Sequence, residues 1–310
     1  MLQFPPLRRR ALLGSLGAIG AVAVIRPSTA ADESPPLAKP IPSTGEPLPA
    51  IGLGTWVTFN VGEDPAARDG RAEVLRAFFA AGGGMVDSSP MYGSSQAVIG
   101  HGLAKLGEPA GLFAATKVWT WSGGAGPEQI AESRELWGVD RFDLLQVHNL
   151  LSWEAHLETL LAMKADGRVR YVGVTTSHGR RHDELEAIMR GQPIDFVQVT
   201  YNAVDREVEE RILPLAAERG IAVIANRPFR GGPLVDLVER HPLPGWAAAE
   251  LDCANWAQFL LKFIVSHPAV TCAIPATTRV DHLGENMGAA RGRLPDAATR
   301  ARMAAHVEGL

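Results

Sequence analysis

Gly84-Met85-Val86-Asp87-Ser88-Ser89-Pro90-Met91-Tyr92-Gly93 is the stretch on which the fold prediction depends. The apolar pair after a run of glycines is typical of the start of a buried strand. Asp87 then closes that strand, and Tyr92 follows on a short loop. In a barrel of alternating strands and helices, the C-terminal rim carries the catalytic groups. The pattern therefore predicts a catalytic aspartate and tyrosine, although taken alone it fits a surface aspartate and a half-buried tyrosine equally well.

Short apolar runs alternate with longer stretches of helical period along the rest of the chain. The strands are expected at residues 53–57, 85–88, 112–118, 142–148, 169–175, 196–200, 222–226 and 270–274. The helices are expected at 66–81, 95–106, 128–137, 153–165, 183–190, 207–219, 247–266 and 281–291. Several helices end at a residue that favours a left-handed C-cap, namely Gly82, Gly107, Gly138, Gly167 and Gly220. Eight strand–helix units predict an α/β fold, a single-domain (β/α)₈ TIM barrel.

An open, doubly wound sheet is the competing α/β architecture. Such a sheet carries a glycine-rich phosphate turn after its first strand. Gly52-Leu53-Gly54 matches the first two glycines of that turn, but no third glycine follows at the required spacing. The closed barrel is therefore favoured.

Composition narrows the function classes. The 310 residues are 46% hydrophobic and 21% charged, which is enough apolar material for one large core. Residues 1–30 hold four arginines and no acids, so the rest of the chain has 26 basic against 34 acidic residues, about −8. An acidic chain of this kind is a poor nucleic-acid binder. Cys253 and Cys272 lie among apolar neighbours and are expected to be buried free thiols rather than a disulfide framework.

The N-terminal 30 residues are expected to be an export signal rather than part of the fold. Arg8, Arg9 and Arg10 precede an uncharged apolar stretch over 11–25, and Ala30 ends a small-residue cleavage site. The stretch is shorter than the ~20 residues that span a bilayer. Consecutive arginines resemble a twin-arginine (Tat) signal, which predicts a periplasmic or exported protein. An uncleaved anchor stays open. Residues 31–47, rich in proline, are expected to form an extended arm, and 48–310 the barrel domain.

Polar residues end three consecutive predicted strands. Asp87 and Tyr92 follow the second strand, Lys117 closes the third and His148 closes the fourth. A nearby ammonium lowers the pKa of a tyrosine, a carboxylate holds the ammonium in place, and a neutral imidazole orients a carbonyl oxygen. This set protonates an alkoxide as a hydride reaches carbon, or runs the reverse. It predicts no metal site.

These residues, in this order, resemble the catalytic tetrad of the aldo-keto reductases, which are (β/α)₈ enzymes that use NADPH or NADH. The resemblance covers about residues 48–291 and is most specific at 87–95, 198–202 and 274–279. It implies that Tyr92 is the general acid, with Lys117 and Asp87 tuning it and His148 orienting the carbonyl. It also implies that Gln198 holds the nicotinamide carboxamide.

The eighth unit fits a phosphate-binding site on its own evidence. Thr277, Thr278 and Arg279 end a strand and open a helix, so hydroxyls and helix N–H groups are expected to face a phosphate. An arginine here favours the 2′-phosphate of NADP, with NAD still possible. Glu285 and Asn286 match the family's contacts to adenine.

The sequence departs from the family at three places. Thr175 and Thr176 replace the Ser-Asn pair that contacts the carboxamide. Asn226 and Arg227 stand where an aromatic ring stacks on the nicotinamide, and Arg227 is a candidate to stack there or to bind the pyrophosphate. His282 replaces an arginine that assists the 2′-phosphate.

The substrate is expected to be a small carbonyl compound held by Trp56, Trp119 and Asn149. Two rival functions remain open. One is a nucleotide-binding regulatory or partner-binding subunit with little turnover. The other is a barrel lyase or isomerase that uses Lys117 as a Schiff base. The oligomeric state is not encoded.

Overall fold

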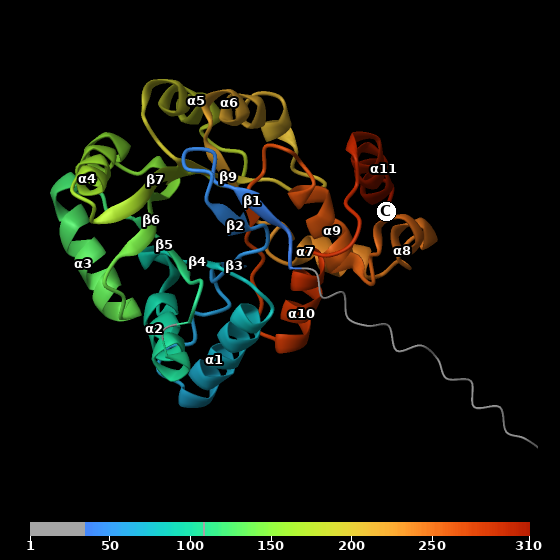
Figure 1. Cartoon of the computed structure of the whole chain (residues 1–310), viewed down its shortest axis with the longest axis horizontal. Coiled ribbons are helices and arrows are strands. Elements are labelled where there is room, and N and C mark those ends of the chain that lie inside the picture. The colour runs from blue at the N-terminus through green and yellow to red at the C-terminus, as the bar shows by residue number, and fades with distance from the viewer. Residues whose placement is uncertain (1–34, 108) are drawn as a thin grey trace, which may run out of the picture. The chain divides into compact units, whose positions relative to one another are not determined.

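The computed structural model describes residues 35–107 and 109–310. The central feature is one parallel sheet whose strands follow each other in chain order (Figure 1). Its strands are β3 (Leu53–Gly54), β4 (Met85–Asp87), β5 (Phe113–Val118), β6 (Phe142–Val147), β7 (Val169–Thr175), β8 (Phe196–Thr200), β9 (Ala222–Asn226) and β10 (Cys272–Ala273). The first and last strands are shorter than expected.

Backbone hydrogen bonds join the two ends of this sheet. Gly52 N donates to Ala273 O at 2.8 Å, and Gly54 N donates to Pro275 O at 2.9 Å. A Cβ atom on Gly54 would lie 2.8 Å from Ile274 O, so only glycine permits this approach. The sheet therefore closes, and the predicted (β/α)₈ barrel is confirmed. Gly52 and Gly54, which do not fit the pattern of a phosphate-binding turn, instead allow the first and last strands to pair and close the barrel.

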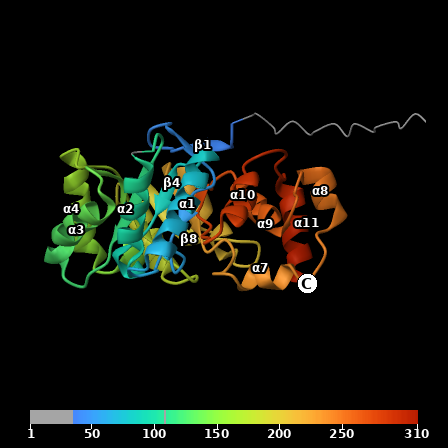
Figure 2. The same ribbon diagram turned by 90° about the horizontal axis from the view of Figure 1, so that it is seen from below.

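Helices surround the barrel, as Figures 1 and 2 show. They are α1 (Pro65–Ala80), α2 (Ser95–Leu106), α3 (Gly126–Trp137), α4 (Trp153–Ala165), α5 (His182–Gly191), α6 (Ile212–Arg219), α7 (Pro233–Val238), α8 (Gly245–Leu251), α9 (Trp256–Val265), α10 (Val280–Gly288) and α11 (Ala297–Glu308). The glycines predicted to end helices all have positive φ, between 65° and 85°. Within the described residues, none of the helices is long and apolar enough to cross a membrane.

The long helix expected at 247–266 is wrong. The chain instead breaks between α8 and α9, because Asp252 adopts a left-handed φ of 55° and Asn255 caps the start of α9 by accepting a hydrogen bond from Gln258 N. The helix expected at 207–219 is also interrupted and starts only at Ile212 after a short turn. Neither α7 nor α11 was expected, because alanine-rich or very short segments give a weak apolar period.

Residues 38–49 form a hairpin rather than an extended arm. Strand β1 (Ala38–Pro40) pairs antiparallel with β2 (Pro47–Pro49). Ile41 and Leu48 are buried against residues at the N-terminal ends of the barrel strands, such as Phe113. Burial of these side chains explains why a proline-rich segment folds here. The signal expected at 1–30 lies outside the described residues.

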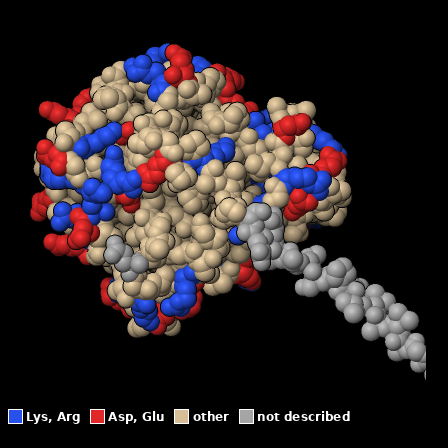
Figure 3. All heavy atoms as spheres, in the orientation of Figure 1, with Lys and Arg blue, Asp and Glu red and all other residues tan. Residues whose placement is uncertain are grey.

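Two buried apolar clusters hold the domain together. One lies between the barrel and its helices, and the smaller one fills the barrel interior beneath the hairpin. Cys253 and Cys272 are buried free thiols, as predicted. On the face seen in Figure 3, basic and acidic side chains are interspersed.

Candidate active site

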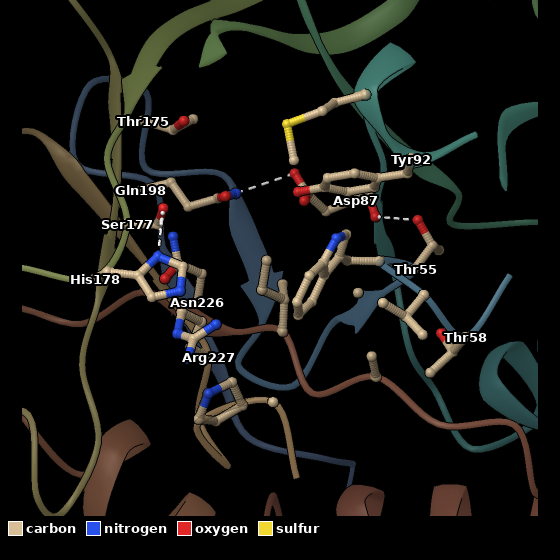
Figure 4. A pocket seen from close by; sticks show the side chains of 18 of the residues that line it. Thr55, Thr58, Asp87, Tyr92, Thr175, Ser177, His178, Gln198, Asn226 and Arg227 are labelled. Carbon is tan, nitrogen blue, oxygen red and sulfur yellow. Dashed lines mark hydrogen bonds between the residues drawn. The ribbon is translucent and has the colours of Figure 1, made fainter. Parts of the chain in front are cut away.

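A cavity of about 370 Å³ opens at the C-terminal ends of the strands. Its walls come from the ends of β3, β4, β6, β7, β9 and β10 and the loops that follow them, and β8 contributes Gln198 from within the strand. Ten of its lining residues are labelled in Figure 4. A concave site at this end of the barrel is where the fold places its chemistry.

A buried ion pair lies at the base of this cavity. Lys117 Nζ donates to Asp87 Oδ1 at 2.5 Å, and their side chains are 0% and 2% exposed. The other carboxylate oxygen accepts from Gln198 Nε2 at 3.1 Å, as Figure 4 shows. It also accepts from Gln146 Nε2 at 3.3 Å. A buried carboxylate is therefore matched by one charge and two amide donors.

Tyr92 stands on a tight turn between this ion pair and the cavity. The turn (Pro90–Tyr92) is capped by Ser89 and followed by Gly93, whose φ is 60°. A Cβ atom on Gly93 would lie 2.4 Å from Asn60 Oδ1, so this position requires glycine. Lys117 Nζ lies 5.2 Å from the centroid of the Tyr92 ring. The turn thus holds the phenol over the buried ammonium.

The electrostatics of the phenol differ from the expectation. Burial raises the pKa of the Tyr92 hydroxyl above its ordinary value, and the Lys117 charge opposes only part of this rise. The prediction of a lowered pKa is therefore wrong, because desolvation of the phenolate outweighs the attraction of the ammonium. Burial acts to lower the pKa of Lys117, but Asp87 and Tyr92 outweigh it and leave that pKa raised. The pair is thus a neutral phenol beside a protonated amine.

His148 completes the cluster predicted from the sequence. Its ring meets the Tyr92 ring edge-on, with centroids 5.6 Å apart and planes at 85°. Its Nδ1 lies 2.7 Å from Ser89 Oγ. Burial, with a smaller effect of Lys117, lowers the pKa of His148 well below its ordinary value, so the imidazole is neutral. Tyr92, Lys117, Asp87 and His148 are therefore brought together as predicted.

The five residues expected at the nicotinamide all line the cavity, namely Thr175, Thr176, Gln198, Asn226 and Arg227. Gln198 is bound to Asp87, and Thr175 Oγ1 accepts from Asn149 N at 2.9 Å. Asn226 donates to Thr176 O at 2.9 Å and accepts from Thr200 Oγ1 at 2.8 Å. The Thr176 hydroxyl is buried and has no hydrogen-bond partner within the described part of the chain. An amide-bearing ligand would satisfy it.

An imidazole and a guanidinium face Tyr92 across the cavity. Figure 4 shows His178 and Arg227 beside Asn226, opposite Tyr92 and Asp87. His178 and Arg227 have left-handed φ values of 61° and 52°. Non-glycine residues held in this region mark loops whose geometry is imposed by their surroundings.

The residues expected at the adenosine phosphate lie beyond this cavity, around the start of α10. Thr277 Oγ1 accepts from Arg279 N at 3.1 Å. Arg279 also pairs with Asp281, and both side chains are more than half exposed. Glu285 and Asn286 lie on α10 itself. None of these residues lines the cavity, and their cofactor roles stay predictions.

Two of the three residues expected to bind substrate line the cavity, namely Trp56 and Asn149. Trp119 does not, and Gln129 instead bonds both its backbone N–H and its carbonyl. No role was expected for Gln146, although it lies on β6 only two residues before His148, which directly follows that strand. Side chains two residues apart in an extended segment point to the same face, so Gln146 is expected to face the barrel interior with His148. This alternation is the sequence signal that could have identified Gln146.

The comparisons agree with this geometry. The sequence profile of the Aldo/keto reductase family matches residues 50–303. The methylglyoxal reductase YeaE of Escherichia coli (strain K12) is 31% identical over 254 residues, which cover 77% of this chain and 84% of that protein. The NADH-specific methylglyoxal reductase of the same organism is 26% identical over 247 residues, covering 68% and 72%.

Solved structures share the fold. A thermostable aldo-keto reductase bound to the inhibitor epalrestat has a TM-score of 0.70 at 25% identity, covering 87% of this chain and 99% of that one. An aldo/keto reductase from Klebsiella pneumoniae in complex with NADP and acetate has a TM-score of 0.67 at 23% identity, covering 85% and 93%. On the family match and the identity to its Escherichia coli relative, this chain belongs to the aldo/keto reductase family of oxidoreductase enzymes.

Proposed function

We propose that this enzyme reduces the carbonyl of a small aldehyde or ketone with NADP(H), or oxidises the corresponding alcohol, with Tyr92 as general acid or base. The observation that carries the proposal is the convergence of Tyr92, His148 and the Lys117–Asp87 pair on one wall of the cavity. When bound, the nicotinamide supplies or accepts the hydride.

The side chains divide the remaining work. His148 is neutral and donates a hydrogen bond to the carbonyl oxygen. Tyr92 keeps its proton at neutral pH and gives it to that oxygen as negative charge develops. Lys117 stabilises the phenolate that remains, and Asp87 holds Lys117 in place. A Lys117 amine that is kept protonated is a poor nucleophile, which disfavours the Schiff-base alternative.

The cavity fits a nicotinamide at its inner end. The unpartnered Thr176 hydroxyl and the Gln198 amide supply the polar contacts that a carboxamide needs. NADP is proposed over NAD because Arg279 stands at the start of α10, and the Klebsiella structure is a complex with NADP and acetate. Arg279 is paired with Asp281, so NAD use stays open.

The substrate is proposed to be a short aldehyde, with methylglyoxal as the first candidate. Two curated relatives are named methylglyoxal reductases. Trp56, Met91 and Phe229 give the outer cavity an apolar wall beside the catalytic cluster. A small carbonyl compound with a short apolar body fits this combination.

The test is the loss of NADPH absorbance with a panel of aldehydes and ketones, repeated with NADH. The proposal expects turnover that saturates with at least one aldehyde. Mass spectrometry of the natively purified protein supplements it by detecting a retained dinucleotide. The proposal is overturned if NADPH binds but none of the carbonyl compounds in the panel is turned over.

Cofactor binding without turnover is what the rival function, a nucleotide-binding regulatory subunit, predicts. The observation that favours it is the altered nicotinamide wall, where Asn226 and Arg227 stand in place of an aromatic ring. Binding of NADPH without turnover of any carbonyl compound in the panel is the expected signature of this rival.

We also propose that the protein is exported. The support is the sequence of residues 1–30, with Arg8, Arg9 and Arg10 ahead of an apolar stretch. A twin-arginine route carries folded proteins, which suits an enzyme with a bound cofactor. Intact-mass analysis of periplasmic and cytoplasmic fractions tests this, since a chain starting after Ala30 is expected outside the cytoplasm. Full-length protein confined to the cytoplasm overturns it.

A further inference from the structure

We propose that Ser89 is a positioning residue that fixes the single proton of neutral His148 on Nε2, the ring nitrogen available to substrate. The inference deepens the proposed carbonyl reduction and rests on it, because Nδ1 faces Ser89 and only Nε2–H is left to donate to a carbonyl oxygen. The juxtaposition that carries it is the 2.7 Å contact between Ser89 Oγ and His148 Nδ1.

The contact is sealed from water. Ser89 is 0% exposed and His148 is 5% exposed. A hydroxyl carries one proton and two lone pairs, so it can donate one hydrogen bond and accept two. Each bond that it makes limits whether it donates or accepts in the next. Ser89 Oγ already accepts the backbone N–H of Met91 at 3.2 Å. One lone pair is thereby used, and the proton and the second lone pair remain.

Two proton arrangements are compatible with the contact between Ser89 Oγ and His148 Nδ1. In the first, Ser89 donates its proton to Nδ1, and the imidazole proton is on Nε2. In the second, Nδ1–H donates to Ser89 Oγ, and the hydroxyl proton needs another acceptor. Within residues 35–107 and 109–310, Ser89 Oγ has hydrogen bonds only to His148 and Met91. The second arrangement therefore leaves a buried donor unpaired, and the first is favoured.

Ser89 also holds the turn that carries Tyr92. Ser89 is the N-cap of the turn over Pro90–Tyr92, and its carbonyl accepts Tyr92 N at 2.9 Å. His148 Nε2 makes no hydrogen bond within the described part of the chain, while the residue lines the cavity. One serine thus holds the turn that carries the acid and orients the imidazole that receives the carbonyl.

Ser88 supplies a matched control. It precedes Ser89 directly and is equally buried at 0% exposed, but its hydroxyl has no hydrogen-bond partner among the described residues. Removing that hydroxyl removes the same atom from a neighbouring site without touching His148. A general effect of a smaller side chain in this strand end would therefore affect both variants alike.

The experiment is ¹⁵N NMR of the histidine-labelled protein, with the His148 signals assigned by their loss in His148→Asn. The wild type is expected to show Nε2 protonated and Nδ1 unprotonated at neutral pH. Ser89→Ala is expected to lose this preference, whereas Ser88→Ala is expected to keep it. A wild-type spectrum with protonated Nδ1, or one left unchanged by Ser89→Ala, overturns the proposal.

Kinetics provide the second readout. Ser89→Ala is expected to lower kcat/KM for the aldehyde by about 10- to 100-fold, with NADPH affinity unchanged. Ser88→Ala is expected to match the wild type, and equal losses in both variants overturn the assignment. The spectra need no turnover, so they decide the tautomer even if the carbonyl panel fails. If Ser89→Ala does not fold, a wild-type spectrum with protonated Nδ1 still overturns the proposal.

Discussion

Lys117 Nζ lies 5.2 Å from the centroid of the Tyr92 ring and donates a 2.5 Å hydrogen bond to Asp87. The ammonium therefore lies close both to the Asp87 carboxylate and to a phenol that, in the proposed reaction, becomes negative only during turnover. Because the ion pair is buried, removing one member leaves the other charge without compensation. This coupling gives separate consequences for stability and for pH dependence.

Lys117→Met is expected to lower the free energy of unfolding by about 3–5 kcal/mol, since it strands the buried Asp87 carboxylate. The double variant Asp87→Asn/Lys117→Met is expected to recover part of this loss, because no charge is then left unpaired. Urea denaturation of the three proteins measures both effects.

The control is Arg168→Ala, which breaks a 3.0 Å pair with Asp166 whose side chains are 56% and 62% exposed. Little change is expected there, because water already screens the pair. A single Lys117→Met variant as stable as Arg168→Ala would contradict a buried, obligatory pair.

The pH dependence of reduction follows from the raised pKa of Tyr92. In the proposed reduction the protonated phenol is the active form, so kcat/KM is expected to stay level through neutral pH and to fall only above the ordinary tyrosine value of about 10. Lys117 opposes the rise, so Lys117→Met should move the fall to still higher pH. A fall that moves to lower pH in this variant would show that Lys117 does not act on the Tyr92 phenolate.

Thr176→Val is expected to separate binding from folding. The Thr176 hydroxyl has no partner among the described residues, so its loss should leave stability unchanged or slightly higher. NADPH binding should weaken by about 2- to 10-fold if the hydroxyl meets the carboxamide.

The matched control is Thr116→Val, whose buried hydroxyl donates to Gln96 Oε1 at 2.9 Å. It should show the reverse, with lower stability and unchanged NADPH binding. Fluorescence titration and urea denaturation of both variants check the pair. Identical behaviour of the two threonines would remove Thr176 from the cofactor site.

Acid stability is expected to depend on His267. Burial and the nearby Arg300 lower the pKa of His267 from its ordinary 6.5 to about 4. Between these two pH values the His267 imidazole is protonated in the unfolded chain but not in the folded one. Stability is therefore lost as pH falls from about 6.5 to about 4. His267→Asn should lose less stability than the wild type over this range in urea denaturation. An equal or larger loss would contradict this assignment.

The sequence was sufficient for the barrel and for the four converging residues. Strand periodicity and helix-ending glycines specify the order of elements, and the C-terminal ends of parallel strands meet at one rim. Breaks such as Asp252–Asn255 were missed, because a left-handed residue inside a helical pattern depends on tertiary contacts. Asp252, for example, is held by Arg293 at 2.7 Å from a distant segment.

The finer electrostatics were not predictable from residue order. The pKa of Tyr92 depends on how far burial outweighs Lys117, and this balance exists only once the walls are assembled. The roles of Ser89 and Gln146 likewise depend on which atoms face each other across strands. Trp119 shows the opposite error, since its position after a strand suggested a cavity wall that it does not form.

The most direct test of the account is the single-turnover rate of Tyr92→Phe, loaded with NADPH and mixed rapidly with the best aldehyde of the panel. The account predicts a rate about 10²- to 10⁴-fold below the wild type with unchanged NADPH affinity, because only the proton donor is removed. A rate equal to the wild type would contradict Tyr92 as the acid.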